Sequence, residues 1–300
     1  MKKAFKVIAV ILGVLVILVG GLALAGQVLS DRKMNRTVAV TVAAVAPAGD
    51  AAALARGKYL FESRGCMECH GRDGHGGDVI DDGAMFVHAP NITGGKGGVT
   101  AQYAAEDWVR TIRHGVKPSG KPVLIMPSED YNRLTDEDLA ALVGYVRSLP
   151  PVQGRGAELL LPLPVKALYA FGVVKDAAEK IDHGLPPSKP VPAAVNAEHG
   201  AYVANACIGC HGPGLSGGKI PGGPPDWPAA ANLTPGRGSA MVRYDTPEKF
   251  RAMLRTGKRP DGSEVSRVMP FRSLGSMDDT DAGALYAFLK SVAPRDAGNR

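Results

Sequence analysis

The chain has 300 residues and a mass of 31.3 kDa, which corresponds to roughly two domains. Glycine (38) and proline (23) are abundant, but no Gly-X-Y period occurs, which excludes a collagen-like chain. Long segments with a periodic apolar pattern exclude wholesale disorder. The net charge of +6 comes without any run of lysine or arginine, which argues against nucleic-acid binding.

The first expected element is a membrane-spanning helix. Val7–Gly26 is a run of twenty apolar or small residues, long enough to cross a bilayer, with basic residues on both sides. A signal peptide cut after Ala23-Leu24-Ala25 is the alternative. The run exceeds a typical signal core, which favours the anchor. We therefore expect an anchor or signal segment at residues 1–29 and an Ala/Val/Pro-rich tether at residues 30–50.

All four cysteines lie in two C-x-x-C-H motifs, Cys66–His70 and Cys207–His211. Two thiols three residues apart on one helical turn can each form a thioether with a haem vinyl group, and the adjacent histidine then ligates the iron. A thioredoxin-like pair or half of a zinc site would use one C-x-x-C. Histidine follows both motifs, no βαβ pattern surrounds either, and 141 positions separate them. Haem attachment is therefore the prediction.

The two motifs belong to an internal repeat. The offset between equivalent residues is 141 at the cysteines and rises to 143 near the end of each copy, so only two small insertions occur over about 95 residues. We expect one domain at residues 51–150, a second at residues 195–300, and an interdomain linker at residues 151–194. The linker contains Leu159-Leu160-Leu161 and a short helix near residues 165–174. It would pack between the domains or lie on the membrane surface.

Each copy is expected to be all-α, with the porphyrin completing an aromatic-poor core. One helix leads to the motif, over residues 51–65 and 196–206, and a middle helix covers residues 105–115 and 248–257. The last helix is capped by Thr135 and carries an apolar stripe, and its twin starts at Asp278 or Asp279. No alternating strand pattern is convincing.

A low-spin electron carrier needs a second axial ligand besides His70 and His211. Met126 and Met269 are equivalent in the repeat, and each precedes a proline. Thioether ligation raises the potential relative to two nitrogen ligands. The rival methionines lack matched partners in the repeat, and a methionine can also simply fill the core. They are Met85, Met241, Met253 and Met277, and the further alternatives are His75, His88 and His114.

Two further sets of matched residues have two interpretations each. Arg113 and Arg255 would pair with haem propionates or lie on solvated helix faces. The asparagine and threonine of each Asn-x-Thr sequence would bind propionates or hold the loop. These sequences are Asn91-Ile92-Thr93 and Asn232-Leu233-Thr234.

With these motifs the chain resembles the membrane-anchored dihaem c-type cytochromes of bacteria, which are similar to cytochrome subunits of periplasmic dehydrogenases. The resemblance implies two tandem cytochrome c domains and two covalently attached haem c groups. It also implies a single-pass inner-membrane protein with its haem domains in the periplasm, or a soluble periplasmic protein after cleavage. The dehydrogenase relatives commonly carry three haem motifs, and this chain has two. The implied haem-binding residues are Cys66, Cys69, His70, Met126, Cys207, Cys210, His211 and Met269.

The expected function is electron transfer rather than catalysis. Electrons would pass from a periplasmic or membrane-bound donor, such as a dehydrogenase, to another cytochrome or a terminal oxidase. The alternative is a haem enzyme, a dihaem peroxidase or a sulfur-compound oxidase, with one open iron. Two matched Met-Pro sequences argue against that alternative, because both irons would be closed.

Overall fold

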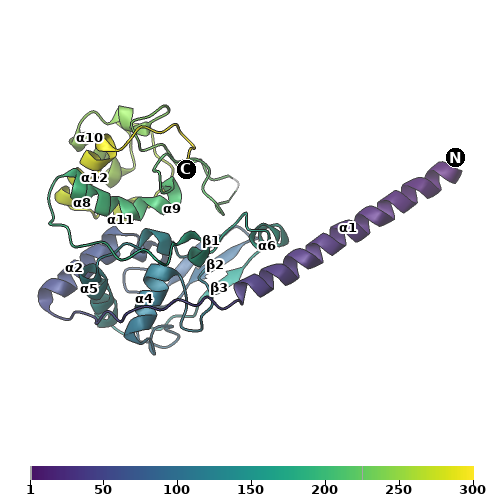
Figure 1. Ribbon diagram of the computed structural model, residues 1–300, viewed down its shortest axis with the longest axis horizontal. Helices are drawn as coiled ribbons and strands as arrows, with labels where there is room; N and C mark the ends of the chain where they lie inside the picture. Colours follow the sequence, from purple (N-terminus) through teal and green to yellow (C-terminus); the bar gives the residue numbers. More distant parts are fainter. Residues whose placement is uncertain (1, 225) are drawn as a thin grey trace.

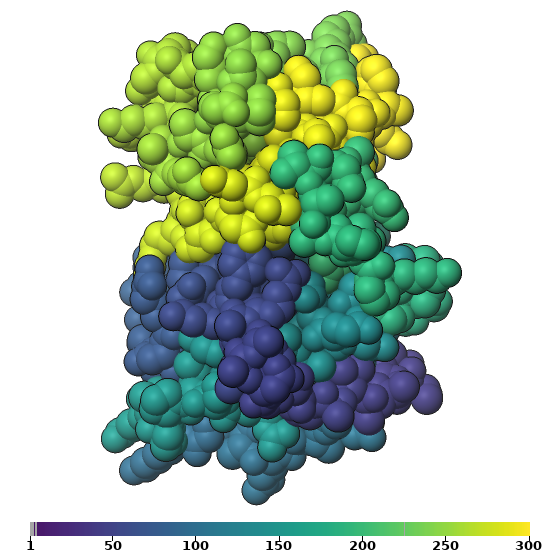
Figure 2. Space-filling model, turned by 90° about the vertical axis from the view of Figure 1, so that its left-hand side faces the viewer, coloured from purple at the N-terminus to yellow at the C-terminus, as the bar shows by residue number. Residues whose placement is uncertain are grey.

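A computed structural model describes residues 2–224 and 226–300, with the side chains of residues 2 and 4 excepted. Figure 1 shows two stacked bodies and one long helix that projects from the lower body. Figure 2, from the side away from that helix, shows the yellow-green C-terminal part resting on the blue-to-teal N-terminal part.

The projecting helix is α1 (Lys2–Met34). Its apolar side chains from Phe5 to Leu24 are exposed, and it is the one helix among the described residues that is long and apolar enough to cross a membrane. After it, residues 35–50 run along the N-terminal body. Val38 N donates to Gly120 O (2.9 Å) and Ala48 N to Ala140 O (3.0 Å), so this stretch is attached rather than free.

Domain 1 is built on a crossing of two helices. Its elements are α2 (Ala51–Ser63), α3 (Cys66–His70), α4 (Ala105–His114), η1 (Ser128–Asp130) and α5 (Asp136–Ser148). Asp50 caps α2 and Thr135 caps α5 through hydrogen bonds from Ala53 N and Asp138 N. A side chain at Gly57 would collide with the backbone of Ala141. Glycine therefore permits the close crossing of α2 over α5.

Domain 2 repeats this arrangement. Its elements are α8 (Ala197–Val203), η2 (Ala204–Cys207), α9 (Ile208–His211), η3 (Ala240–Arg243), α10 (Pro247–Thr256), α11 (Phe271–Leu274) and α12 (Asp279–Ser291). Gly200 on α8 lies against the backbone of Ala284 on α12, as Gly57 lies against Ala141. Both glycines are thus needed for the same reason at equivalent positions.

A small sheet departs from the all-α expectation. It has the order β1 (Gly77–Asp81), β2 (Phe86–Ala89) and β3 (Glu158–Leu160), with both pairs antiparallel. The turn between β1 and β2 is closed by Asp82, whose carboxylate accepts from Ala84 N and Met85 N. The strands have three to five residues and β3 comes from the linker, so no alternation of useful length marks them in the sequence. Tandem helical domains remain the correct coarser description.

The linker packs on domain 1 and on α1. After β3 it forms α6 (Leu163–Ala170), which lies beside the end of α1, and then α7 (Ala177–Lys180). Ala177 N donates to Val123 O of domain 1 (3.0 Å). At the foot of α1, Arg36 donates to both carboxylate oxygens of buried Asp176 (2.6 and 2.9 Å). This ion pair fixes α1 relative to the linker.

Candidate haem sites

Each C-x-x-C-H motif occupies a single helical turn at the boundary between a helix and a loop. The turn that holds Cys66–His70 starts after Gly65 (φ 90°) and ends at Gly71 (φ 73°). The second motif ends in the same way at Gly212 (φ 76°). A positive φ is costly for any residue with a side chain. Gly71 and Gly212 end the helical turn after each histidine, and Gly65 separates the first motif from α2, whereas the second motif follows directly on α8 and η2.

The two motif histidines are oriented by matched backbone carbonyls. His70 Nδ1 lies 3.0 Å from Pro90 O, and His211 Nδ1 lies 2.8 Å from Ala231 O. A carbonyl only accepts, so Nδ1 carries the proton and Nε2 keeps its lone pair, as a metal-ligating nitrogen would need. Burial lowers the pKa of both imidazoles although the carbonyls oppose it. Both rings are therefore neutral at pH 7, as ligation to a metal requires.

The four thiols lack the properties of a redox pair or a thiolate metal site. Burial raises the pKa of Cys66 and Cys207 to about 12 and that of Cys69 and Cys210 to about 11. Reactive or metal-binding cysteines have lowered pKa values. All four are half-buried and free of disulfides, and no cluster of three acidic, histidine or cysteine ligands occurs among residues 2–224 and 226–300.

Met126 and Met269 occupy equivalent places beside the haem motifs. Cys66 and Met126 border one apolar cluster, centred on Leu60 and Trp108. Cys207 and Met269 border its counterpart in domain 2. Each domain thus packs one motif thiol and a thioether on one apolar core, while the second thiol and the neutral imidazole follow within the same motif, and this donor set fits a covalently bound haem. The identity of the sixth ligand stays a prediction.

The rival methionines have other surroundings. Met241, Met253 and Met277 are buried in the core of domain 2. Met85 packs with Val87 and Leu161 in a separate small cluster at the sheet.

The rival histidines are engaged elsewhere. His75 Nδ1 lies 2.5 Å from Asp73 on the surface, and His88 Nδ1 lies 2.6 Å from Asp78. The rings of His114 and His183 approach to 3.0 Å between their Nδ1 atoms, and burial lowers the pKa of His114 to about 4.

The matched Asn-x-Thr sequences hold loops. Asn91 Oδ1 accepts from Thr93 N and Oγ1 (2.8 Å each), while its Nδ2 donates to Val152 O (2.9 Å). Asn232 makes the equivalent bonds to Thr234 and to Arg295 O. All four side chains are buried. Each sequence ties the loop that orients the motif histidine to the segment that follows the last helix.

The matched arginines connect helices. Arg113 is buried and donates to Asp136 Oδ1 (2.7 Å) and Leu134 O (2.6 Å). Its equivalent Arg255 donates to Asp279 Oδ1 (2.6 Å) and is half-exposed. Both therefore link the middle helix to the start of the last helix, a contact that neither interpretation of the sequence included.

Each haem motif contacts the other domain, just after its Met-Pro sequence, through reciprocal hydrogen bonds that the sequence analysis did not predict. Glu68, inside the first motif, accepts from Ser273 N (2.8 Å) and Oγ (3.0 Å), four residues after Met269. Gly209, inside the second motif, donates its N–H to Asp130 Oδ1 (2.6 Å), four residues after Met126. Each motif thus touches the loop that carries the other domain's methionine. The repeat offers a signal, since Glu68 aligns with Gly209 and Asp130 with Ser273.

A second reciprocal pair flanks these contacts. Tyr59 OH donates to Asp281 Oδ2 of domain 2 (2.6 Å), and Tyr202 OH donates to Asp138 Oδ2 of domain 1 (2.6 Å). The residues match at an offset of 143. The interface therefore has approximate twofold symmetry.

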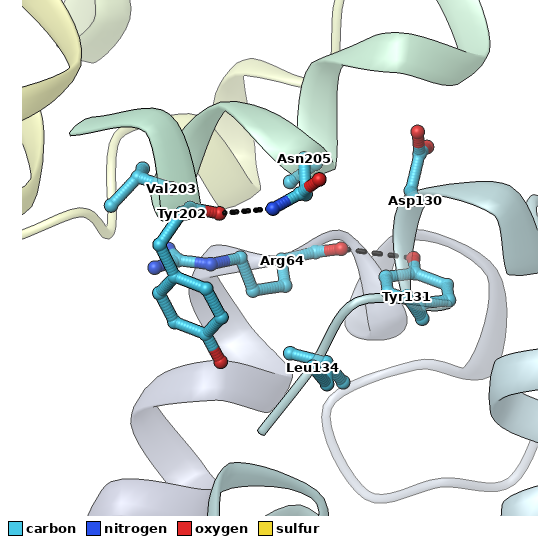
Figure 3. Close-up of a pocket in the computed structure, with 8 residues that line it drawn as sticks. Arg64, Asp130, Tyr131, Leu134, Tyr202, Val203 and Asn205 are labelled. Carbon is cyan, nitrogen blue, oxygen red and sulfur yellow. Dashed lines mark hydrogen bonds between the residues drawn. The ribbon is translucent and has the colours of Figure 1, made fainter. Parts of the chain in front are cut away.

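Buried Arg64 breaks that symmetry. Its guanidinium lies 2.5 Å from Asp281 Oδ2. Arg64 also lines a small pocket between the domains together with Asp130, Tyr131 and Tyr202 (Figure 3). Burial raises the pKa of Asp281, but Arg64 and the hydrogen bonds from Tyr59, Arg64 and His199 outweigh it and hold the pKa at about 2. Asp281 is therefore an anion at the centre of the interface.

Comparisons with known proteins assign both domains to one kind of fold. Residues 52–146 match the family of cytochrome c oxidase, cbb3-type, subunit III, and residues 197–293 match the cytochrome c family. The two matches cover the two halves of the repeat and include both haem motifs.

Relatives that match most of this chain are named as cytochrome subunits of dehydrogenases. The chain is 29% identical over 264 residues to the fructose dehydrogenase cytochrome subunit of Gluconobacter japonicus, covering 80% of this chain and 52% of the relative. It is 24% identical to the gluconate 2-dehydrogenase cytochrome c subunit of Pantoea cypripedii (81% and 60% covered). It is 26% identical to the cytochrome c subunit of a quinone alcohol dehydrogenase from Gluconobacter oxydans (83% and 57% covered).

The chain thus spans between half and two thirds of the length of these relatives. Together with the two motifs and the matched histidine, cysteine and methionine surroundings, the comparisons show that the chain is a tandem c-type cytochrome, similar to the cytochrome subunits of bacterial dehydrogenases.

Proposed function

We propose that each domain holds one covalent haem c and that the chain relays single electrons between redox proteins. Cys66 and Cys69 would attach the first haem, with His70 and Met126 as axial ligands. Cys207, Cys210, His211 and Met269 would hold the second. A c-type haem with histidine and methionine ligands supplies a reversible one-electron couple of raised potential.

The observation that carries this proposal is the reciprocal contact of each haem motif with the segment that follows the other domain's methionine. Glu68 bonds to the loop after Met269, and Asp130 bonds to the motif residue Gly209. These contacts bring the attachment turn of each domain against the methionine loop of the other. Ser273 is buried in this contact, while Glu68, Gly209 and Asp130 are half-buried, and the hydrogen bonds hold the two sites in a fixed relative position. Such an arrangement suits exchange between two centres within one chain.

The relatives support a place for the chain between a dehydrogenase and a respiratory acceptor. Those relatives are named as cytochrome subunits of fructose, gluconate and alcohol dehydrogenases. We propose that α1 anchors the chain in the inner membrane, with the N-terminus in the cytoplasm and both domains in the periplasm. Covalent haem attachment takes place outside the cytoplasm, which supports this orientation. The haem-enzyme alternative is not favoured, since these relatives are electron-transfer subunits.

A visible-spectrum redox titration of the purified holoprotein tests this function. We expect two low-spin haems per chain, both with the weak red charge-transfer band of methionine ligation and neither binding carbon monoxide readily. Met126→Ala and Met269→Ala should each remove half of that band and open one iron to carbon monoxide. Met85→Leu, in a separate cluster, should leave the band intact. A wild-type protein that binds carbon monoxide at once would instead support an enzyme with an open iron.

A further inference from the structure

The linker helix α6 lies beside the end of α1, where the chain leaves the apolar segment. Ala167 approaches Gly26 so closely that a Cβ on Gly26 would lie 3.2 Å from the Ala167 Cβ. Gly26 is buried in this contact, and so is Ser30 one turn later. Small residues on α1 therefore form the surface on which α6 packs, and Ala167 lies level with Gly26 along the α1 axis.

The position of Gly26 sets the depth of α6. Val7–Gly26 is the uncharged apolar run of α1, and twenty helical residues span about 30 Å, the thickness of the hydrocarbon core. If this run crosses the membrane, then Gly26 lies at the outer boundary of the hydrocarbon. Because α6 packs at the level of Gly26, it lies at that same boundary, at the foot of α1 in Figure 1.

The segment formed by α6 and its flanks exposes several large apolar side chains. Leu163 is 50% exposed, Leu168 44%, Phe171 61% and Val173 64%, and Leu160 just before the helix is 61% exposed. Leu161 and Tyr169 of the same segment are buried and fix it to the protein. We call the five exposed side chains the α6 apolar patch. Five large apolar side chains in one short segment are unusual for a surface that faces water.

Polar contacts fix the patch relative to α1. Lys33 Nζ donates to Tyr169 O (2.8 Å), and Lys166 Nζ donates to Gln27 Oε1 (3.0 Å). The Tyr169 hydroxyl donates to Asp176 (2.6 Å), the same carboxylate that Arg36 binds. Lys33 Nζ also pairs with Glu179 (3.0 Å), so both amines are held by contacts inside the protein. These contacts hold α6 against the end of α1 and leave the apolar side chains to face outward.

We propose that the α6 apolar patch inserts into the outer leaflet of the membrane and forms a second attachment beside α1. This inference rests on the proposal that α1 spans the bilayer, and it adds that the linker sets the orientation of the haem domains. A single helix would let the domains tilt and rotate freely above the membrane. With α6 fixed to α1 and inserted in lipid, domain 1 has one defined face toward the membrane.

The depth of residue 171 in the bilayer tests this inference. The full-length holoprotein carrying Phe171→Cys is labelled with a nitroxide and reconstituted into vesicles of phosphatidylethanolamine and phosphatidylglycerol. Haem attachment occupies the four native cysteines. Val242→Cys is the matched control, because Val242 is an exposed apolar residue (74%) on domain 2. We expect the label at 171 to collide several-fold more with oxygen and several-fold less with a water-soluble nickel complex than the label at 242.

The same preparation separates the possible failures. If the holoprotein does not sediment with the vesicles after carbonate extraction, the anchor itself is wrong and the inference falls with it. If it sediments but the label at 171 is as accessible to nickel as the label at 242, the anchor stands and the α6 inference is overturned. Spin–spin broadening at 171 would mean that a second copy covers the patch, which also overturns it. A label at Val173 must give the same result as the label at 171.

Discussion

The two domains share one plan and differ in what surrounds it. Both have a haem motif on one turn, a histidine bound to a loop carbonyl, a buried Asn-x-Thr sequence and a Met-Pro loop that touches the other domain. Domain 1 alone carries α1, the sheet and the linker. The shared features are those that a covalently held haem needs, and the additions serve attachment of the chain to its surroundings.

The interface between the domains also combines shared and unshared contacts. Six residues separate Tyr59 from Cys66, but only four separate Tyr202 from Cys207. The longer segment of domain 1 contains Arg64, which extends into the interface and binds Asp281. Asp138, the equivalent of Asp281, binds Arg56 of its own domain instead. The tyrosine contacts are therefore symmetric and the charge pairs are not.

The largest expected effect tests whether the domains are equivalent as haem sites. The double substitution Cys66→Ser/Cys69→Ser should halve the haem content, and Cys207→Ser/Cys210→Ser should do the same, because in the proposed arrangement each pair would supply both thioethers of one haem. The ratio of haem to protein, measured as the pyridine haemochrome, gives the result. His75→Ala is the control, since that ring is exposed and bonds only to Asp73. Full haem content in either double variant would refute attachment at that motif.

The charge asymmetry predicts unequal effects at the two matched aspartates. Asp281→Asn leaves the buried Arg64 without a counter-charge, which should cost about 3–5 kcal/mol in the free energy of unfolding. Asp138→Asn leaves Arg56, whose side chain is one third exposed and can be hydrated, and should cost about 1.5–3 kcal/mol. Denaturant unfolding of both variants measures the difference. Equal losses would show that Arg64 contributes no more than its exposed counterpart.

The lowered pKa of Asp281 predicts an acid-sensitive interface. The native carboxyl titrates near pH 2, against an ordinary value of 3.8, so between these values the folded chain binds fewer protons than the unfolded chain. The contribution to stability, about 2 kcal/mol, is fully present above about pH 4 and is lost as the pH falls toward 2. Between about pH 5 and about pH 2, the free energy of unfolding should therefore fall less steeply in Asp281→Asn than in the wild type. Parallel curves would contradict the assignment.

Much of the candidate site could be predicted because the two copies of the repeat can be aligned with each other. Cys66, His70 and Met126 are recognisable by residue type, spacing and their partners at a nearly constant offset. The interface was hidden because Tyr59 and Asp281 lie 222 positions apart and in different copies. Their matches Tyr202 and Asp138 are visible in the same alignment, but an alignment gives no reason to place one copy against the other.

The sheet and the roles of the polar residues needed coordinates for a different reason. Strands of three to five residues are too short for an alternation to stand out, and β3 comes from a linker with no counterpart in the repeat. Arg113 and Asn91 are buried polar groups whose partners are backbone carbonyls at Leu134 and Val152. Any segment offers carbonyls, so residue type cannot identify the one that accepts.

The hairpin of domain 1 gives the smallest and most local test of the comparison. In the equivalent loop of domain 2, the described residues 218–224 and 226–230 form the isolated bridge Gly218↔Ala230, which matches the first pair of β1 and β2, Gly77↔Ala89. The additional pairs in domain 1 depend on the turn at Gly83, where φ is 81° and a Cβ would meet no neighbouring atom. Gly83→Ala should therefore cost about 1 kcal/mol from backbone conformation alone.

Gly94 provides the matched control for this substitution. A Cβ there also has open space, and its φ lies outside the left-handed region, so Gly94→Ala should be neutral or stabilise by about 0.5 kcal/mol. Denaturant unfolding followed through the haem of each domain separates the effects. A loss confined to domain 1 would mean that the sheet is part of that domain's stability. An equal loss in both domains would mean that the hairpin acts through the interface, and no loss would mean that the extra strand pairs add nothing to the shared plan.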